Sequence, residues 1–191
     1  SVQIAVLTMI ISTIVGTALA IGLVRAHSGT SKGFNILMLI PLITPEIVAG
    51  ISALLIFSQL GIGLSIWTIV IAHITFSIGF VAIIVRARLA GMDESIFEAA
   101  RDLGATPWRT FTRVTFPLIV PGIIAGFLMS FTLSIDDFVI TFFVAGVGVT
   151  TLPLQIYSLI KVAVTPEINA ISTLLMALTL TLIALASRFA P

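Results

Sequence analysis

The sequence contains no cysteine and very little charge. Its 191 residues include nine Lys and Arg and eight Asp and Glu. Without Cys there is no disulfide framework, thiol nucleophile or thiolate metal site. A formal net charge of +1 also argues against a strongly basic nucleic-acid-binding protein. Only 9% of the residues are charged and 59% are apolar, whereas about 25% of the residues of a soluble domain are charged. This composition predicts a membrane protein.

Five long apolar segments follow one another along the chain. They cover residues 2–24, 34–60 (interrupted), 62–85, 114–135 and 168–187. As a helix, the first would be about 34 Å long, enough to cross a hydrocarbon core of about 30 Å. The period-2 alternation of barrel strands is absent. We therefore predict an all-α membrane protein with five transmembrane helices in a single domain, residues 1–191.

Lys and Arg lie almost entirely on one side of these five predicted spans, and Lys161 alone lies on the other. The positive-inside rule makes the basic side cytoplasmic, with the N-terminus outside and the C-terminus inside. Ser1 leads directly into an apolar span without a basic region or cleavage site, which favours a truncated start over a signal peptide. The residues on the basic side are Arg25, Lys32, Arg86, Arg88, Arg101, Arg109, Arg113 and Arg188.

The longest polar stretch, residues 86–113, is predicted to lie outside the membrane. Ser95 and Glu98 have the spacing of a capping box, which predicts a helix over residues 95–103. Gly104 is the residue type expected where a helix ends in left-handed geometry. Thr106 and Pro107 predict the start of a second helix that continues into the next span.

This stretch resembles the EAA loop of binding-protein-dependent ABC permeases. The resemblance rests on Glu98-Ala99-Ala100, on Gly104 four residues later, and on Val114-Thr115-Phe116-Pro117. In that family the loop is a coupling helix that docks on the nucleotide-binding subunit. The resemblance implies a type I ABC importer transmembrane domain, normally of six spans, with the first missing here. The residues implied to couple to the ATPase are Ser95, Glu98, Ala99, Ala100, Leu103 and Gly104.

The chain has no phosphate-binding loop of the form Gly-x-x-x-x-Gly-Lys-Ser/Thr. We therefore expect ATP and Mg to be bound by a separate ATPase chain, and no cofactor here. No Ser/His/Asp or Cys/His arrangement can be assembled, so the chain is predicted to be a transport subunit and not an enzyme. His73, in an uncharged span, is expected to be a packed polar side chain rather than a metal ligand.

A further resemblance, to permeases of spermidine/putrescine importers, rests on residues 133–139, 152–162 and 165–170. It implies a bacterial inner-membrane location and a polyamine cargo. It also implies three protein partners: a second permease in a pseudo-twofold heterodimer, an ATPase dimer, and a periplasmic or lipid-anchored polyamine-binding protein. Membrane lipid is the remaining partner, and no nucleic acid is expected.

A polyamine pathway should offer carboxylates and aromatic faces to a polycation. The acidic candidates are Glu46, Asp136 and Asp137, and Tyr157 is the aromatic candidate. Glu46 is predicted to lie deep in its span, but Thr44-Pro45-Glu46 is also a helix-start pattern, so a purely structural role stays open. Asp136 and Asp137 could be interface carboxylates, and Tyr157 an interfacial anchor. We favour Asp136 or Asp137 as the cation contact, since the apolar residues 138–145 suggest a segment folded back into the protein.

Two alternative functions remain open at this stage. The first is the same kind of permease for another small solute, such as a cationic amino acid, an aminophosphonate or chelated iron. The second is a secondary transporter driven by an ion gradient, with which broken helices at the membrane midplane are compatible. The EAA-like stretch argues against the second, because such a carrier has no ATPase to engage.

Overall fold

The computed structural model describes residues 1–25, 39–40 and 42–189, and all regular elements within these ranges are helices. Four of them are long and apolar enough to cross a membrane: α1 (Val2–Arg25), α4 (Ile66–Ala90), the continuous helical run Pro107–Asp136, which ends in α7 (Phe116–Asp136), and α10 (Pro166–Ser187). They correspond to four of the five predicted spans. The predicted all-α membrane fold is confirmed.

The described part of the interrupted span predicted over residues 34–60 consists of two helical stretches. Residues 39–40 and 42–43 are helical, and α3 (Glu46–Gln59) follows, whose 14 residues extend about 21 Å, less than a hydrocarbon core. The predicted break is present, because Pro45 has an extended backbone with φ −55° and ψ 134° just before α3. Residues 34–38 and 41 of this span, like Lys32, lie outside the described residues.

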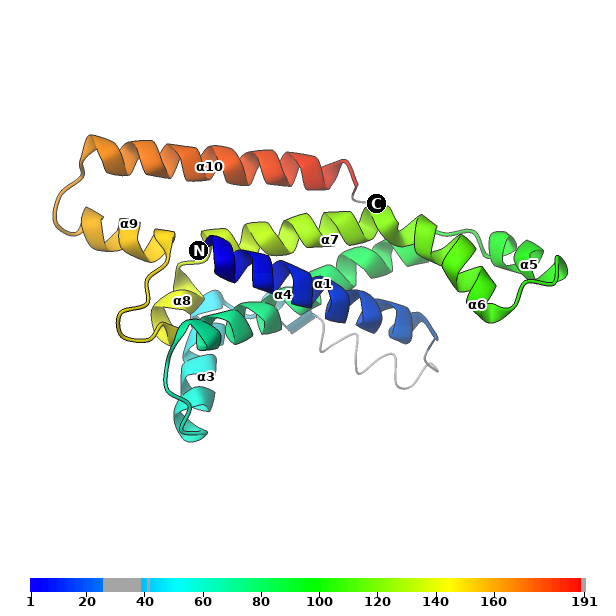
Figure 1. Cartoon of the computed structure of the whole chain (residues 1–191), viewed down its shortest axis with the longest axis horizontal. Coiled ribbons are helices and arrows are strands. Elements are labelled where there is room, and N and C mark those ends of the chain that lie inside the picture. Colours follow the sequence, from blue (N-terminus) through cyan, green and yellow to red (C-terminus); the bar gives the residue numbers. More distant parts are fainter. Residues whose placement is uncertain (26–38, 41, 190–191) are drawn as a thin grey trace.

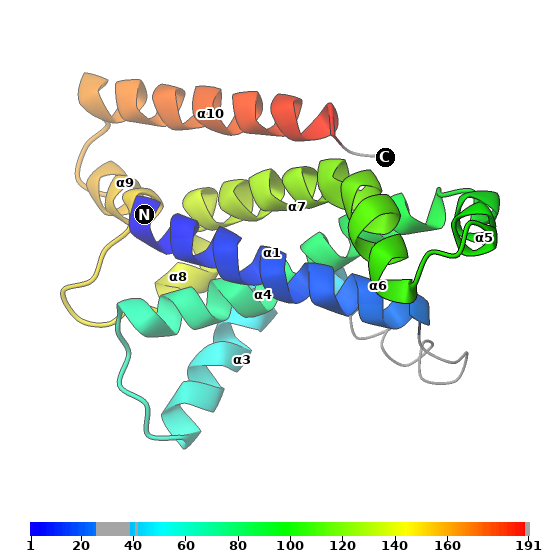
Figure 2. The same cartoon turned by 45° about the vertical axis from the view of Figure 1, so that its right-hand side comes forward.

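Helices α1, α4 and α7 pack against one another and form the body of the molecule, and α10 packs on α7 (Figures 1 and 2). Small residues allow the close approach of α4 and α7. A Cβ on Gly126 would lie 3.1 Å from Val81 Cγ1. The hydroxyls of Ser12 in α1 and Ser130 in α7 are 2.6 Å apart and hydrogen-bonded in the interior. The Gly-x-x-x-Gly surface of residues 122–126 therefore serves helix packing.

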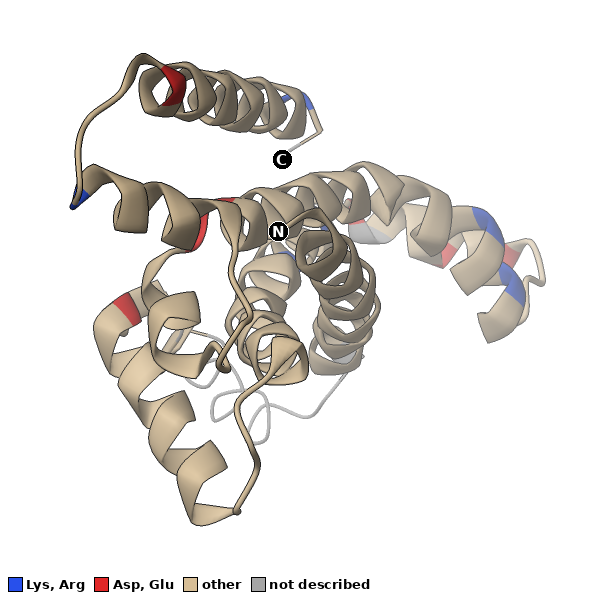
Figure 3. Cartoon of the chain, turned by 60° about the vertical axis from the view of Figure 1, so that its left-hand side comes forward, with Lys and Arg blue, Asp and Glu red and all other residues tan. Residues whose placement is uncertain are grey.

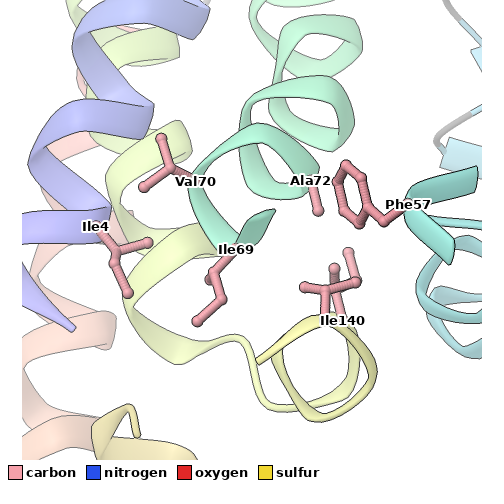
Figure 4. Close-up of a cluster of buried hydrophobic side chains, with 7 residues drawn as sticks. Ile4, Phe57, Ile69, Val70, Ala72 and Ile140 are labelled. Atoms are coloured by element: carbon pink, nitrogen blue, oxygen red, sulfur yellow. The ribbon is translucent and has the colours of Figure 1, made fainter. Parts of the chain in front are cut away.

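A hydrophobic core lies at the end of the bundle where α4 begins. After α7 the chain folds back as α8 (Val139–Val144), which packs on α3 and α4. This confirms the fold-back predicted for residues 138–145. Side chains from α1, α3, α4 and α8 meet in this core (Figure 4): Ile4, Phe57, Ile69, Val70, Ala72, Ile140 and Val144.

Helix α4 begins four residues later than predicted and ends five residues later. Ser65 caps its N-terminus, and the backbone N–H of Ser65 donates to the side chain of Thr68 in return, at 2.8 Å. This reciprocal capping fixes the start at Ile66. Gly61, with φ +67°, ends the turn after α3 and leaves residues 61–64 non-helical. The last helix before α10 is the short α9 (Leu152–Ile160).

Candidate functional site

Two short helices project beyond the bundle at the end opposite α8 (Figure 1). Helices α5 (Glu94–Asp102) and α6 (Pro107–Thr110) lie between α4 and α7, and we call residues 91–110 the elbow. Basic residues gather toward this end, whereas acidic residues lie both here and at the opposite end (Figure 3). The elbow contains the EAA-like motif.

The start of α5 differs from the prediction. The N-cap is Asp93, whose carboxylate accepts a hydrogen bond from the backbone N–H of Ser95 at 2.9 Å. Ser95 is therefore inside the first turn, and the predicted capping box of Ser95 and Glu98 is wrong. Asp caps helices as well as Ser does, and here it occurs two residues earlier. The same hydrogen bond lowers the pKa of Asp93, because it favours the ionised carboxylate.

The end of α5 matches the prediction. Gly104 has φ +75°, a left-handed conformation that suits a residue without a side chain. Its N–H donates to Arg101 O at 2.8 Å, and the N–H of Ala105 donates to Ala100 O at 3.0 Å. This pair of bonds is a Schellman motif, which satisfies the last carbonyls of the helix. The chain thus reverses sharply between α5 and α6.

The return from the elbow into the bundle is also as predicted. The hydroxyl of Thr106 accepts a hydrogen bond from Arg109 N at 3.4 Å, and Pro107 is the first residue of α6. One π-helical segment, η1 (Phe111–Thr115), then joins α6 to α7 without a break. A movement of the elbow would therefore be transmitted directly to α7, and through residues 91–93 to α4.

The elbow exposes large apolar side chains. They lie outside the helices that are long enough to cross a membrane, or at the ends of those helices. Ile96 is 41% exposed, Leu103 88% and Trp108 72%. The side chains of Glu98 and Ala99 are exposed as well, and Ala100 is half-buried. Behind α5, a hollow of about 980 Å³ separates the elbow from the ends of α1 and α4. Exposed apolar groups on a rigid, capped helix are typical of a protein-docking surface.

At the opposite end, α7 ends at two adjacent carboxylates. Asp136 is the last residue of α7, and Asp137 has an extended ψ of 122°. The side chain of Asp136 is exposed, whereas that of Asp137 is only 8% exposed. The structure therefore separates the two candidates that the sequence left equivalent.

Asp137 is bound within the protein. Its carboxylate caps α8 by accepting hydrogen bonds from Ile140 N at 3.3 Å and Thr141 N at 2.8 Å. It also lies 3.0 Å from Nε2 of His73, which is 2% exposed in α4. The prediction that His73 is a packed polar side chain is confirmed. Its pairing with Asp137, 64 residues away, was missed, although an ionisable residue in an apolar span is itself a signal.

The remaining two candidates, Glu46 and Tyr157, lie on α3 and α9. Glu46 is the first residue of α3, after the N-cap Pro45, so the helix start predicted from Thr44-Pro45-Glu46 is present. It is exposed. The ring of Tyr157 in α9 is 4.6 Å from that of Phe138, and the ammonium of Lys161 lies 4.6 Å from the Tyr157 ring centre. Among the described residues, no group of three or more metal-ligating side chains comes together.

Comparison with known proteins agrees with this architecture. The sequence is 40% identical over 185 residues to the "Spermidine/putrescine transport system permease protein PotC" of Haemophilus influenzae, covering 97% of this chain and 72% of that protein. It is 44% identical over 186 residues to the "Putrescine transport system permease protein PotI" of Escherichia coli, covering 92% of this chain and 65% of that protein. The chain thus spans a little less than two thirds of the PotI relative.

One solved structure, titled "Crystal structure of an amino acid ABC transporter with histidines", has the same fold. Its TM-score is 0.76 at 21% identity, over 98% of this chain and 88% of that one. The family model described as "Binding-protein-dependent transport system inner membrane component" matches residues 12–190. The chain therefore belongs to the family of inner membrane components of binding-protein-dependent transport systems.

Proposed function

We propose that this chain is the permease subunit of an ATP-driven importer and forms half of a polyamine pathway across a bacterial inner membrane. The family membership and the polyamine permeases among its relatives support this function. The single observation that carries the ATP-driven part is the elbow. Its helix α5 is capped at both ends, projects beyond the bundle and exposes apolar side chains.

The elbow is suited to docking on an ATPase subunit. Ile96 and Leu103 supply apolar contact area, and the small side chains of Ala99 and Ala100 let α5 approach a groove closely. Because α4 and α7 both emerge from the elbow, a displacement of α5 passes into two helices of the bundle. In this mechanism ATP and Mg are bound by an ATPase dimer. ATP binds more tightly to one conformation of the transporter than to the other, and this difference in binding energy drives alternating access.

The remaining partners follow from the same function. A second permease completes the pathway, and an external binding protein delivers the polyamine. With the elbow in the cytoplasm, α7 runs outward and ends at Asp136, and α10 returns to the cytoplasmic side. The observed clustering of Arg residues at the elbow end supports this orientation under the positive-inside rule.

The proposed cation contact is Asp136, with Glu46 of α3 as a second candidate. Asp136 is exposed, whereas Asp137 is occupied by its own hydrogen bonds. Two exposed carboxylates, Asp136 and Glu46, favour a ligand with several positive charges. The aromatic face of Tyr157 already lies against an ammonium group, that of Lys161, which supports cation–π contact at this end.

The absence of Cys allows a direct crosslinking test of the elbow. Leu103→Cys introduces a single thiol at the C-cap of α5. The matched control is Val147→Cys, since Val147 is 108% exposed at the opposite end. In intact membranes we expect a short bifunctional reagent to link position 103, but not 147, to an ATP-hydrolysing subunit. Failure of position 103 and of Ile96→Cys to capture such a subunit would overturn the docking role.

Transport assays test coupling and cargo separately. Glu98→Lys should uncouple ATP hydrolysis from uptake while the chain still inserts normally, and wild-type uptake would refute the coupling role of this residue. For the cargo, uptake of labelled spermidine should be inhibited by unlabelled putrescine, and Asp136→Asn should slow it severalfold. If uptake is indifferent to polyamines, the importer stands and its cargo is another solute.

A further inference from the structure

His73 connects three parts of the chain inside an otherwise apolar region. Its Nδ1 lies 2.8 Å from the hydroxyl of Ser134 in α7, and its Nε2 lies 3.0 Å from Asp137 Oδ2 and 3.0 Å from Thr141 Oγ1 in α8. One imidazole in α4 therefore joins the residues on both sides of the break between α7 and α8. Burying a histidine in this way is costly unless its nitrogens are bonded, as they are here.

We propose that His73 is a positioning residue for the cation contact. By holding the carboxylate of Asp137 inside the protein, it leaves the carboxylate of Asp136 directed into the transport pathway. This inference rests on the proposed function, in which Asp136 meets the cation, and it adds a residue from a different helix that controls the geometry of that contact.

Asp137 is bonded through both carboxylate oxygens. Its Oδ2 accepts from Thr141 N at 2.8 Å and from the Thr141 hydroxyl at 2.8 Å, and it lies 3.0 Å from His73 Nε2. Its Oδ1 accepts from Ile140 N at 3.3 Å. Each carboxylate oxygen offers about two acceptor positions, so Oδ2 is saturated, and the side chain as a whole is only 8% exposed. Asp137 is therefore poorly placed to meet a passing ammonium group, and its exposed neighbour Asp136 is the better cation contact.

The direction of Asp136 depends on this anchoring. Successive side chains on a helix point about 100° apart, so fixing Asp137 toward α4 and α8 turns Asp136 away from them. This agrees with the exposed side chain of Asp136 and the 8% exposure of Asp137. Without His73, the buried carboxylate of Asp137 loses one of its four hydrogen-bonding partners, and rotation of the last turn of α7 toward water would relieve that deficit. The same rotation moves Asp136 out of the pathway.

A double-mutant cycle on the complete importer in proteoliposomes tests this role. His73→Leu removes the hydrogen bonds of the imidazole, and Asp136→Asn removes the charge. We expect His73→Leu to lower spermidine uptake severalfold, and by no more than Asp136→Asn does, because it acts through Asp136. His73→Gln, which can still donate to Asp137, should recover most of this loss. In the Asp136→Asn background, His73→Leu should cause little further loss, because the two residues act on one contact.

A structural control separates positioning from general damage. Gly126→Ala crowds the contact between α7 and α4, and its effect should multiply with that of Asp136→Asn. If the effects of His73→Leu and Asp136→Asn also multiply, the positioning role of His73 is wrong, whereas the assignment of Asp136 as the cation contact is retained. If Asp136→Asn transports spermidine at the wild-type rate, the cation contact itself is wrong. Should His73→Leu fail to assemble, Thr141→Val, which removes one donor from Asp137, replaces it in the double-mutant cycle. Little further loss in the Asp136→Asn background would support the positioning role, and multiplying effects would refute it.

Discussion

Replacing Gly104 by alanine tests whether the geometry of the elbow is needed for coupling. Gly104 has φ +75°, and a Cβ placed there would meet no atom within 4 Å. The substitution therefore introduces backbone strain and no collision. A left-handed conformation costs an L-residue about 1–2 kcal/mol, which lowers the population of the native turn about 5- to 30-fold relative to alternative turns.

The assay is the amount of polyamine imported per ATP hydrolysed by the complete importer in proteoliposomes. Gly104→Ala should reduce this ratio roughly in proportion to the loss of the native turn, that is, by up to about 5- to 30-fold. Gly104→Asn should be milder, because Asn tolerates the left-handed region. Normal membrane insertion of both variants would locate the defect in the turn.

The matched control is the glycine at the other end of the elbow. Gly91 is the C-cap of α4 with φ −84°, and a Cβ there would lie 3.7 Å from Ala87 O, an ordinary contact. Gly91→Ala should change the ratio by no more than about twofold. If Gly104→Ala behaves like Gly91→Ala, the left-handed turn does not hold α5 for the ATPase, and the reasoning fails.

Three further predictions concern the cap, the helix packing and the aromatic face. Asp93→Ala should speed amide exchange in the first turn of α5. Because the pKa of Asp93 is lowered in the folded protein, the cap stabilises α5 fully above the unfolded pKa of about 3.9. This stabilisation is lost as the pH falls through the lower folded pKa. Gly126→Val should lower the thermal midpoint in detergent by overpacking of about 1–3 kcal/mol, whereas Gly22→Val, with open space at its Cβ, should not. Tyr157→Phe should keep the uptake rate and Tyr157→Ala reduce it, since only the first retains the aromatic face over Lys161.

Much of the fold could be predicted because lipid imposes strong rules on a sequence. Apolar runs of sufficient length gave four of the long helices, and the position of the Arg residues predicted which helix ends lie together. Gly104 and Pro107 marked the turn and the return of the elbow correctly, because left-handed geometry and helix starts have narrow residue preferences. The cap of α5 was misplaced because Asp93 and Ser95 are both good caps, and local sequence does not choose between them.

Tertiary structure alone decided how the two adjacent carboxylates differ. The sequence determined that Asp136 and Asp137 follow an uncharged run at the end of a span, but not which of them is buried. That choice depends on His73, which reaches Asp137 only after α8 folds back onto α4; Thr141 adds a local bond four residues along the chain. Hydrophobic length and local residue preference act along the chain and can be deduced from it, whereas a hydrogen bond between residues 64 positions apart exists only once the helices have packed.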